Sequence, residues 1–242
     1  MREGDPLGEI LAAAVRRENI NPSTGDVLVI AQKIVSKSEG RVVRLSSVVP
    51  SAGAEAIAAR LRIDPRKIEI ILRESRRIVR AEWIESAGRG VIICETHHGL
   101  VCANAGVDES NLDEPDTVLC LPEDPDASAA KIRADLHQML GVDLGVILTD
   151  SFGRPWRVGL VNVAIGVSGV AAIRDCRGQT DSSGRLLQTT ELAVADELAA
   201  AAGLLMGKLD RIPAVLVQGF RADAPPGRAA DLIRAPGGDL FR

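Results

Sequence analysis

Residues 144–154 read Leu-Gly-Val-Ile-Leu-Thr-Asp-Ser-Phe-Gly-Arg, a short apolar run that ends in a polar cluster. The apolar part, residues 144–149, predicts a buried strand that stops at Asp150. Polar side chains that follow a buried strand are a common place for chemistry in α/β proteins. We therefore expect this stretch to carry part of a functional site.

Other segments on either side of this run predict a mixed architecture. Short apolar runs predict strands at residues 26–31, 162–167 and 214–219. Helical spacing of apolar residues predicts helices at 6–19, 54–61, 65–79, 127–140 and 189–205. Residues 90–94 and 100–103 flank His97-His98-Gly99 and predict a β-hairpin, whereas the Pro- and Gly-rich tail from Ala222 predicts a loop. Hairpins combined with strand-to-helix connections predict an α+β, or mixed α/β, fold.

Composition limits the possible classes of protein. A chain of 242 residues suits one large domain or two small intertwined ones, and no repeat or linker marks a boundary. The net charge of −4 offers no basic surface for nucleic-acid phosphates. No apolar run approaches the roughly 20 residues that span a bilayer, so we expect neither a nucleic-acid nor a membrane partner.

The cysteines and histidines predict no structural metal. Cys94, Cys102 and two further cysteines lack Cys-x-x-Cys spacing, and the N-terminus has no apolar signal region, so we expect reduced thiols in a cytoplasmic protein. His97 and His98 lie near two of these cysteines, but they would alternate faces of the hairpin and lack zinc-ligand spacing.

Two segments offer hard oxygen ligands. The stretch Asn104-Ala105-Gly106-Val107-Asp108-Glu109-Ser110-Asn111 combines small residues with a carboxylate and an amide, and Asp108 could bind Mg²⁺ or Mn²⁺. A tight turn capped by Asp108 and Asn111 is the alternative. Asp150 and Ser151 could ligate a metal that bridges nucleotide phosphates, so that two aspartates hold a two-metal site. A simple cap is again the alternative.

Several cations and acids allow two interpretations. Arg154 and Arg157 could bind an anionic substrate, because a guanidinium pairs with a carboxylate or phosphate, or they could lie in a solvated loop. Lys37 could contact a phosphate or lie in solvent. The predicted helix 189–205 carries three acidic residues, Glu191, Asp196 and Glu197. They are by default solvated helix charges, although one of them could face the site. Residues 164–169 match no common dinucleotide or phosphate-loop motif.

In sequence order, five segments resemble the coenzyme F420-0:L-glutamate ligase (F420 γ-glutamyl ligase) family. They are residues 34–40, Ile-Val-Ser-Lys-Ser-Glu-Gly; the stretch 104–111 quoted above; residues 124–129, Asp-Pro-Asp-Ala-Ser-Ala; residues 149–154; and residues 194–197, Val-Ala-Asp-Glu. The resemblance covers nearly the whole chain, so we expect a single γ-glutamyl ligase domain over residues 1–242, built from two subdomains.

This resemblance implies a GTP-dependent ligase that adds L-glutamate to coenzyme F420-0 and then forms γ-linked glutamyl bonds. GTP would convert a substrate carboxylate to an acyl phosphate, which the glutamate amine attacks, releasing GDP and phosphate. The family also implies Mg²⁺ or Mn²⁺, two per site, assisted by K⁺, and an intertwined homodimer of two-subdomain protomers. Metal ions and arginines can stabilise phosphoryl transfer without a protein nucleophile.

By analogy with the family, individual residues receive roles. Asp108 and Asp150 resemble metal ligands, with Ser151 on a second metal. The residues that resemble nucleotide contacts are Gln32, Lys33, Lys37, Asn111, Met206 and Gly207. Arg154 and Arg157 are our own candidates for the residues that bind the phosphodiester of the precursor or the carboxylates of glutamate.

The chain also departs from the family pattern. It reaches its first helix by Pro6, so we expect the family's earlier strand and nucleotide-binding loop to be absent. Lys208 stands where some members offer a glutamate to the second metal. Some relatives carry a C-terminal flavin-binding reductase domain, whereas this chain ends at Arg242 without one, so FMN is not expected. Alternatives are a ligase for another carboxylate, a non-catalytic GTP-binding regulator and a purely structural protein.

Overall fold

A computed structural model describes residues 1–112, 114–221 and 223–239. The chain divides into two compact units that alternate along the sequence. Unit 1 comprises Met1–Asp5, Val35–Glu123 and Phe152–Gly159, and unit 2 comprises Pro6–Ile34, Asp124–Ser151 and Leu160–Arg242. Helix α2 (Gln32–Ser38) crosses from unit 2 into unit 1. Both units combine helices with sheets, mixed in unit 2 and antiparallel in unit 1, which confirms the predicted α+β class.

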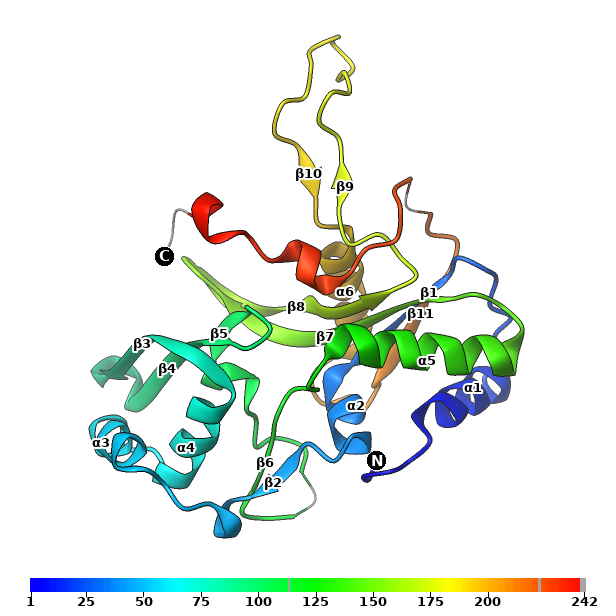
Figure 1. The fold of residues 1–242 in the computed structure, drawn as a ribbon. Coiled ribbons are helices and arrows are strands. Elements are labelled where there is room, and N and C mark those ends of the chain that lie inside the picture. The colour runs from blue at the N-terminus through cyan, green and yellow to red at the C-terminus, as the bar shows by residue number, and fades with distance from the viewer. Residues whose placement is uncertain (113, 222, 240–242) are drawn as a thin grey trace. The chain divides into compact units, whose positions relative to one another are not determined.

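A four-stranded mixed sheet in the order β11-β1-β7-β8 forms the centre of unit 2 (Figure 1). Its strands are β1 (Val27–Ala31), β7 (Gly145–Arg154), β8 (Arg157–Ser168) and β11 (Ala214–Val217). β1 pairs in parallel with β7 and antiparallel with β11. β1 lies inside the sheet and is buried on both faces, which explains its unbroken run of apolar residues.

Helices cover both faces of this sheet. Helix α6 (Val194–Met206) packs on one face, against a core cluster that contains Val27, Val29 and Ile147. Helix α5 (Pro125–Leu140) lies on the other side in Figure 1, with α1 (Leu7–Arg17) packed against it. Strand side chains alternate between faces, so the odd-numbered residues of β1 and the start of β7 face α6.

The two-residue strands β9 (Arg174–Asp175) and β10 (Glu191–Leu192) form the base of a long arm in unit 2 (Figure 1). They shorten the helix predicted at residues 189–205, which begins only at Val194 because residues 191 and 192 pair with β9. The predicted tail loop contains the 3-10 turns Ala229–Leu232 and Pro236–Gly238, while residues 222 and 240–242 lie outside the described part of the chain.

The described residues of unit 1 form two smaller sheets and two helices, in addition to the end of α2. Strands β3 (Ser75–Ile84), β4 (Arg89–Thr96) and β5 (Val101–Ala103) form a three-stranded antiparallel sheet, and β2 (Val42–Arg44) pairs with β6 (Thr117–Leu119). Helices α3 (Ala52–Leu61) and α4 (Pro65–Arg73) share a core with these strands. Single 3-10 turns lie at Leu45–Ser47, Glu85–Ala87 and Asn104–Gly106.

The structure corrects two predicted boundaries that matter for the site. The helix predicted at 65–79 ends at Arg73, because the following residues pair with β4 as strand β3. β7 does not stop at Asp150 but continues to Arg154 and turns directly into β8, so the predicted loop is a tight hairpin with Trp156 at a φ of +58°. The predicted hairpin at the histidines is confirmed as β4 and β5.

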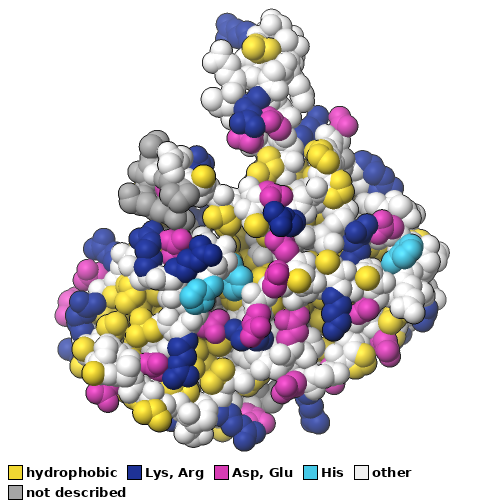
Figure 2. Space-filling model, in the orientation of Figure 1, with side chains coloured by type: hydrophobic (Ala, Val, Ile, Leu, Met, Phe, Trp, Pro, Cys, Tyr) yellow, Lys and Arg dark blue, Asp and Glu magenta, His cyan; other side chains and the backbone are white. Residues whose placement is uncertain are grey.

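The face of the molecule drawn in Figure 2 has no dominant charge. Basic and acidic side chains are interspersed on the face drawn in Figure 2. Among the described residues, no helix combines the length and apolar character that crossing a membrane requires.

Candidate functional site

A left-handed turn holds Asp108 in unit 1. Asn104, Ala105 and Gly106 all have positive φ angles, of +55°, +52° and +76°, and the Val107 amide closes the turn by donating to the Asn104 carbonyl at 2.9 Å. Positive φ is costly for residues other than glycine and often occurs at functional sites. The turn is followed by a two-way backbone hydrogen bond between Asp108 and Leu119, at 3.0 and 2.8 Å, which fixes the Asp108 backbone beside β6.

The Asp108 side chain takes part in a local turn. Its carboxylate accepts hydrogen bonds from the Ser110 amide at 2.7 Å and from the Ser110 hydroxyl at 3.0 Å. The capping role proposed as the alternative for Asp108 is therefore confirmed. It is compatible with metal binding, because an ionised carboxylate offers about four lone-pair directions.

Two predicted nucleotide contacts meet next to this turn. Lys37 Nζ donates a hydrogen bond of 2.6 Å to the backbone carbonyl of Asn111, which has a φ of +60°. Lys37 is half-buried near the end of α2. The structure thus places an ammonium group close to the Asp108 turn, where it could accompany bound phosphate.

In unit 2, Asp150 and Ser151 are consecutive residues of β7. Because strand side chains alternate, they point to opposite faces of the sheet, with Ser151 on the same side as Ile147 and α6. The Ser151 hydroxyl donates a hydrogen bond of 2.9 Å to Asn162 Oδ1 on β8. Carboxylate and hydroxyl oxygens are suitable ligands for Mg²⁺ or Mn²⁺, so the donor chemistry fits two separate ions better than one shared ion.

Asn162, to which the sequence gives no role, and Asp196 both form side-chain hydrogen bonds at β8 in unit 2. Asn162 Nδ2 lies 3.8 Å from Met206 Sδ, which connects Ser151 to the end of α6. Asp196 Oδ1 accepts a hydrogen bond of 2.8 Å from the Ala164 amide, and burial raises the pKa of Asp196 despite this bond. Asparagine is uncommon in strands. Its occurrence in the predicted strand 162–167 is the feature of the sequence that could have identified Asn162 as a candidate. Asp196, by default a solvated helix charge, is half-buried instead, whereas Glu197 is exposed.

The two candidate arginines lie at the tip of the β7–β8 hairpin, which belongs to unit 1. Arg154 Nη2 donates a hydrogen bond of 2.9 Å to the Val158 carbonyl across the hairpin, and its Nε is buried without a partner. Arg157 is exposed. Arg154 therefore has a structural contact already, whereas Arg157 is accessible to an anion from solvent.

The remaining predicted nucleotide contacts are in unit 2. Gln32 is only 1% exposed and Lys33 is half-buried at the start of α2. Met206 is the last residue of α6, and its side chain is buried in the core cluster. A ligand at this stretch would therefore meet the Met206 backbone rather than the Met206 side chain. Gly207 ends the helix with a φ of +55°, and a Cβ there would collide with Asp210.

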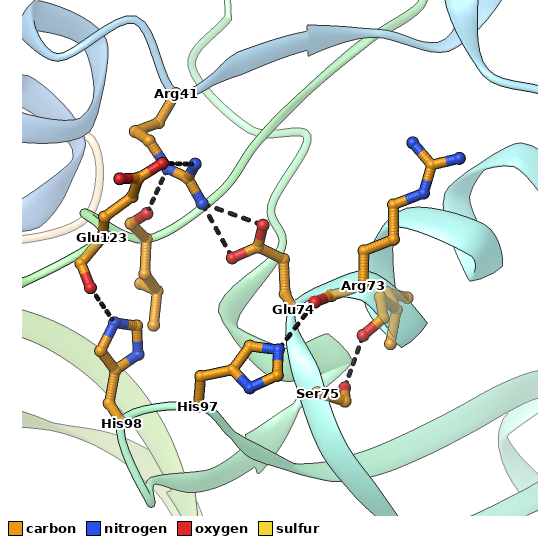
Figure 3. A network of polar contacts seen from close by, with 9 residues as sticks. Arg41, Arg73, Glu74, Ser75, His97, His98 and Glu123 are labelled. Atoms are coloured by element: carbon orange, nitrogen blue, oxygen red, sulfur yellow. Dashed lines mark hydrogen bonds and ion pairs between the residues drawn. The ribbon is translucent and has the colours of Figure 1, made fainter.

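The histidines have structural contacts in unit 1 (Figure 3). His97 Nε2 lies 2.8 Å from the Arg73 carbonyl, and His98 Nε2 lies 3.0 Å from the Glu123 carbonyl. Beside them, Arg41 forms two hydrogen bonds of 2.9 Å with the Glu74 carboxylate. Both rings therefore extend from the β4–β5 turn to backbone carbonyls of other segments of the chain.

Each unit gathers its own subset of the predicted site. Unit 1 contains Lys37, Asp108, Asn111, Arg154 and Arg157. Unit 2 contains Gln32, Lys33, Asp150, Ser151, Met206 and Gly207. Within the described ranges, no group of three or more His, Cys, Asp or Glu side chains is placed to hold a metal ion.

Comparison with known proteins gives full-length similarity to one family. A protein-family model described as F420-0:Gamma-glutamyl ligase matches residues 1–219. A coenzyme F420:L-glutamate ligase from Methanopyrus kandleri is 46% identical over 247 residues, an alignment that covers 100% of this chain and 93% of the relative. An enzyme of the same name from Methanothermobacter thermautotrophicus is 44% identical, over 99% of this chain and 93% of the relative. Another from Methanocaldococcus jannaschii is also 44% identical, over 90% of this chain and 85% of the relative.

Proposed function

Because this chain belongs to the F420-0:gamma-glutamyl ligase family, we propose that it joins L-glutamate to coenzyme F420-0 by an amide bond and then extends the product through γ-linked glutamate. The observation that carries this proposal is similarity over nearly the whole chain to relatives named coenzyme F420:L-glutamate ligase. The reaction belongs to the biosynthesis of coenzyme F420.

The proposed chemistry uses GTP as the activating co-substrate. A carboxylate oxygen of the acceptor attacks the γ-phosphorus of GTP, forming an acyl phosphate and releasing GDP. The amine of glutamate then attacks the acyl carbon, so an amide bond forms, phosphate leaves and the amine loses a proton. Mg²⁺ or Mn²⁺, when bound, would neutralise charge on the phosphates, and K⁺ would assist.

Named residues supply the protein's part of this reaction. Asp108 and Asp150 offer carboxylates and Ser151 a hydroxyl as metal ligands, and Lys37 is held near the Asp108 turn by its bond to the Asn111 carbonyl. Arg157 is exposed and free to meet the carboxylates of glutamate or the phosphodiester of the precursor, while Arg154 stiffens the same hairpin. These contacts position substrates and balance charge, which is most of what phosphoryl transfer requires.

The proposed partner is a second copy of the chain in an intertwined homodimer. Three leucines at and after the end of α6 support this, because Leu204 is 87%, Leu205 65% and Leu209 89% exposed. Large apolar side chains exposed close together in sequence are typical of protein–protein contact surfaces.

The decisive experiment is GDP release by the purified protein with GTP, Mn²⁺ and L-glutamate, with and without coenzyme F420-0, followed by mass analysis of the product. The proposal requires GDP release that depends on both substrates and a product heavier by glutamyl units. Turnover with a different carboxylate would instead indicate a ligase of other specificity, and tight GTP binding without turnover would indicate a regulator.

A further inference from the structure

Asn162 lies between two residues of the proposed site in unit 2. Its Oδ1 accepts the hydrogen bond of 2.9 Å from the Ser151 hydroxyl, and its Nδ2 lies 3.8 Å from Met206 Sδ. Asparagine is depleted in strands, and this one is half-buried in β8. Its two polar ends thus contact two different elements, β7 and α6.

These two neighbours fix the orientation of the Asn162 amide. A thioether sulfur is a weak hydrogen-bond acceptor and never a donor. The amide NH₂ therefore faces Met206, and the amide oxygen faces Ser151. The reversed amide would place an oxygen against the sulfur, two acceptors in contact, and would make Ser151 the acceptor.

The backbone of α6 holds the amide in place. A Cβ at Gly203 would lie 2.9 Å from Asn162 Cγ and 3.0 Å from its Nδ2. These distances are well inside ordinary van der Waals contact. Gly203 therefore lets the helix approach closely enough to leave the Asn162 amide little room to rotate.

This geometry controls the Ser151 proton. A hydroxyl has one proton and two lone pairs, and a cation can bind only on the lone-pair side. We propose that Asn162 is a positioning residue, which draws the Ser151 proton toward β8 and thereby directs the oxygen lone pairs to a divalent cation. This inference rests on the proposed function, in which Ser151 is a metal ligand.

The test measures metal binding directly. Mn²⁺ is titrated into the full-length wild type and Asn162→Leu in the presence of a non-hydrolysable GTP analogue, and free Mn²⁺ is followed by its electron paramagnetic resonance signal. Leucine has a similar size but cannot accept a hydrogen bond. Loss of a group that orients a metal ligand weakens binding by about tenfold or more, so we expect this loss in Asn162→Leu.

A double-mutant cycle separates positioning from general damage. If Asn162 acts through the Ser151 hydroxyl, the Asn162→Leu change should have no further effect on Mn²⁺ affinity in a Ser151→Ala background. Equal weakening in both backgrounds would overturn the inference, because the effect would not pass through Ser151.

A second variant keeps Asn162 itself intact. Gly203→Ala should displace the amide and weaken Mn²⁺ binding in the same direction, whereas Gly53→Ala in α3 is the matched control, because its nearest contact would be Ser51 Oγ at 3.9 Å. Unchanged Mn²⁺ affinity in both Asn162→Leu and Gly203→Ala would overturn this inference alone. A wild type that binds no Mn²⁺ would overturn the metal assignment of the proposed function as well.

Discussion

Gly106→Ala tests how the Asp108 turn is built. Gly106 has a φ of +76°, and a Cβ there would lie 2.7 Å from both Cγ and Cδ1 of Leu121. Leu121 is 1% exposed, so its side chain cannot move into solvent. A left-handed conformation costs an L-residue about 1–2 kcal/mol, and overpacking a core costs about 1–3 kcal/mol. We expect the free energy of unfolding to fall by about 2–5 kcal/mol.

Gly88→Ala is the matched control for this variant. Gly88 also has a positive φ, of +59°, but a Cβ there would meet nothing within 4 Å. It should therefore lose only the conformational part, about 1–2 kcal/mol. The difference between the two variants isolates the contact with Leu121.

Tryptophan fluorescence during urea unfolding is the suitable assay, because Trp83 and Trp156 both belong to unit 1, as do Gly106 and Gly88. Equal destabilisation by the two substitutions would refute the reasoning, since the Leu121 contact would then cost nothing. Displacement of the turn should also move Asp108, so Gly106→Ala should bind Mn²⁺ more weakly than Gly88→Ala.

Three further substitutions test the site, the partner surface and a half-buried carboxyl. Asp150→Ala should abolish GDP release yet change the free energy of unfolding by less than about 1 kcal/mol, because removing a partly exposed ligand carboxylate relieves charge repulsion; a large loss of thermal stability would contradict the assignment. Leu204→Glu should convert the proposed dimer to a monomer in size-exclusion chromatography with light scattering, whereas Ala13→Glu on the exposed side of α1 should not. Burial raises the pKa of Asp196, so its contribution to stability is present at low pH and is lost as pH rises through the folded-state pKa. Unfolding curves measured against pH should show this loss in the wild type and not in Asp196→Asn.

The sequence predicts most of the fold where local pattern and tertiary position agree. The apolar runs of β1 and β11 and the helical spacing of α5 are evident from the chain itself, although α5 begins two residues before the predicted start, after an Asp124 cap that accepts from the Ala127 amide at 2.9 Å. β3 is the informative failure. Its arginines and apolar residues can be arranged on a helix, and only pairing with β4, a contact between different segments, makes residues 75–84 a strand.

The predicted site divides in the same way. Asp108 lies in a turn whose composition, Asn-Ala-Gly before the aspartate, is visible in the sequence, and the local hydrogen bonds of that turn hold it. Ser151 is held differently, because its partner Asn162 comes from the next strand and Gly203 from a helix further along the chain. No spacing rule connects these three positions, since their contact exists only after β7, β8 and α6 have packed. The side chains that offer ligand oxygens can thus be read from the sequence, whereas the group that orients one of them requires the folded structure.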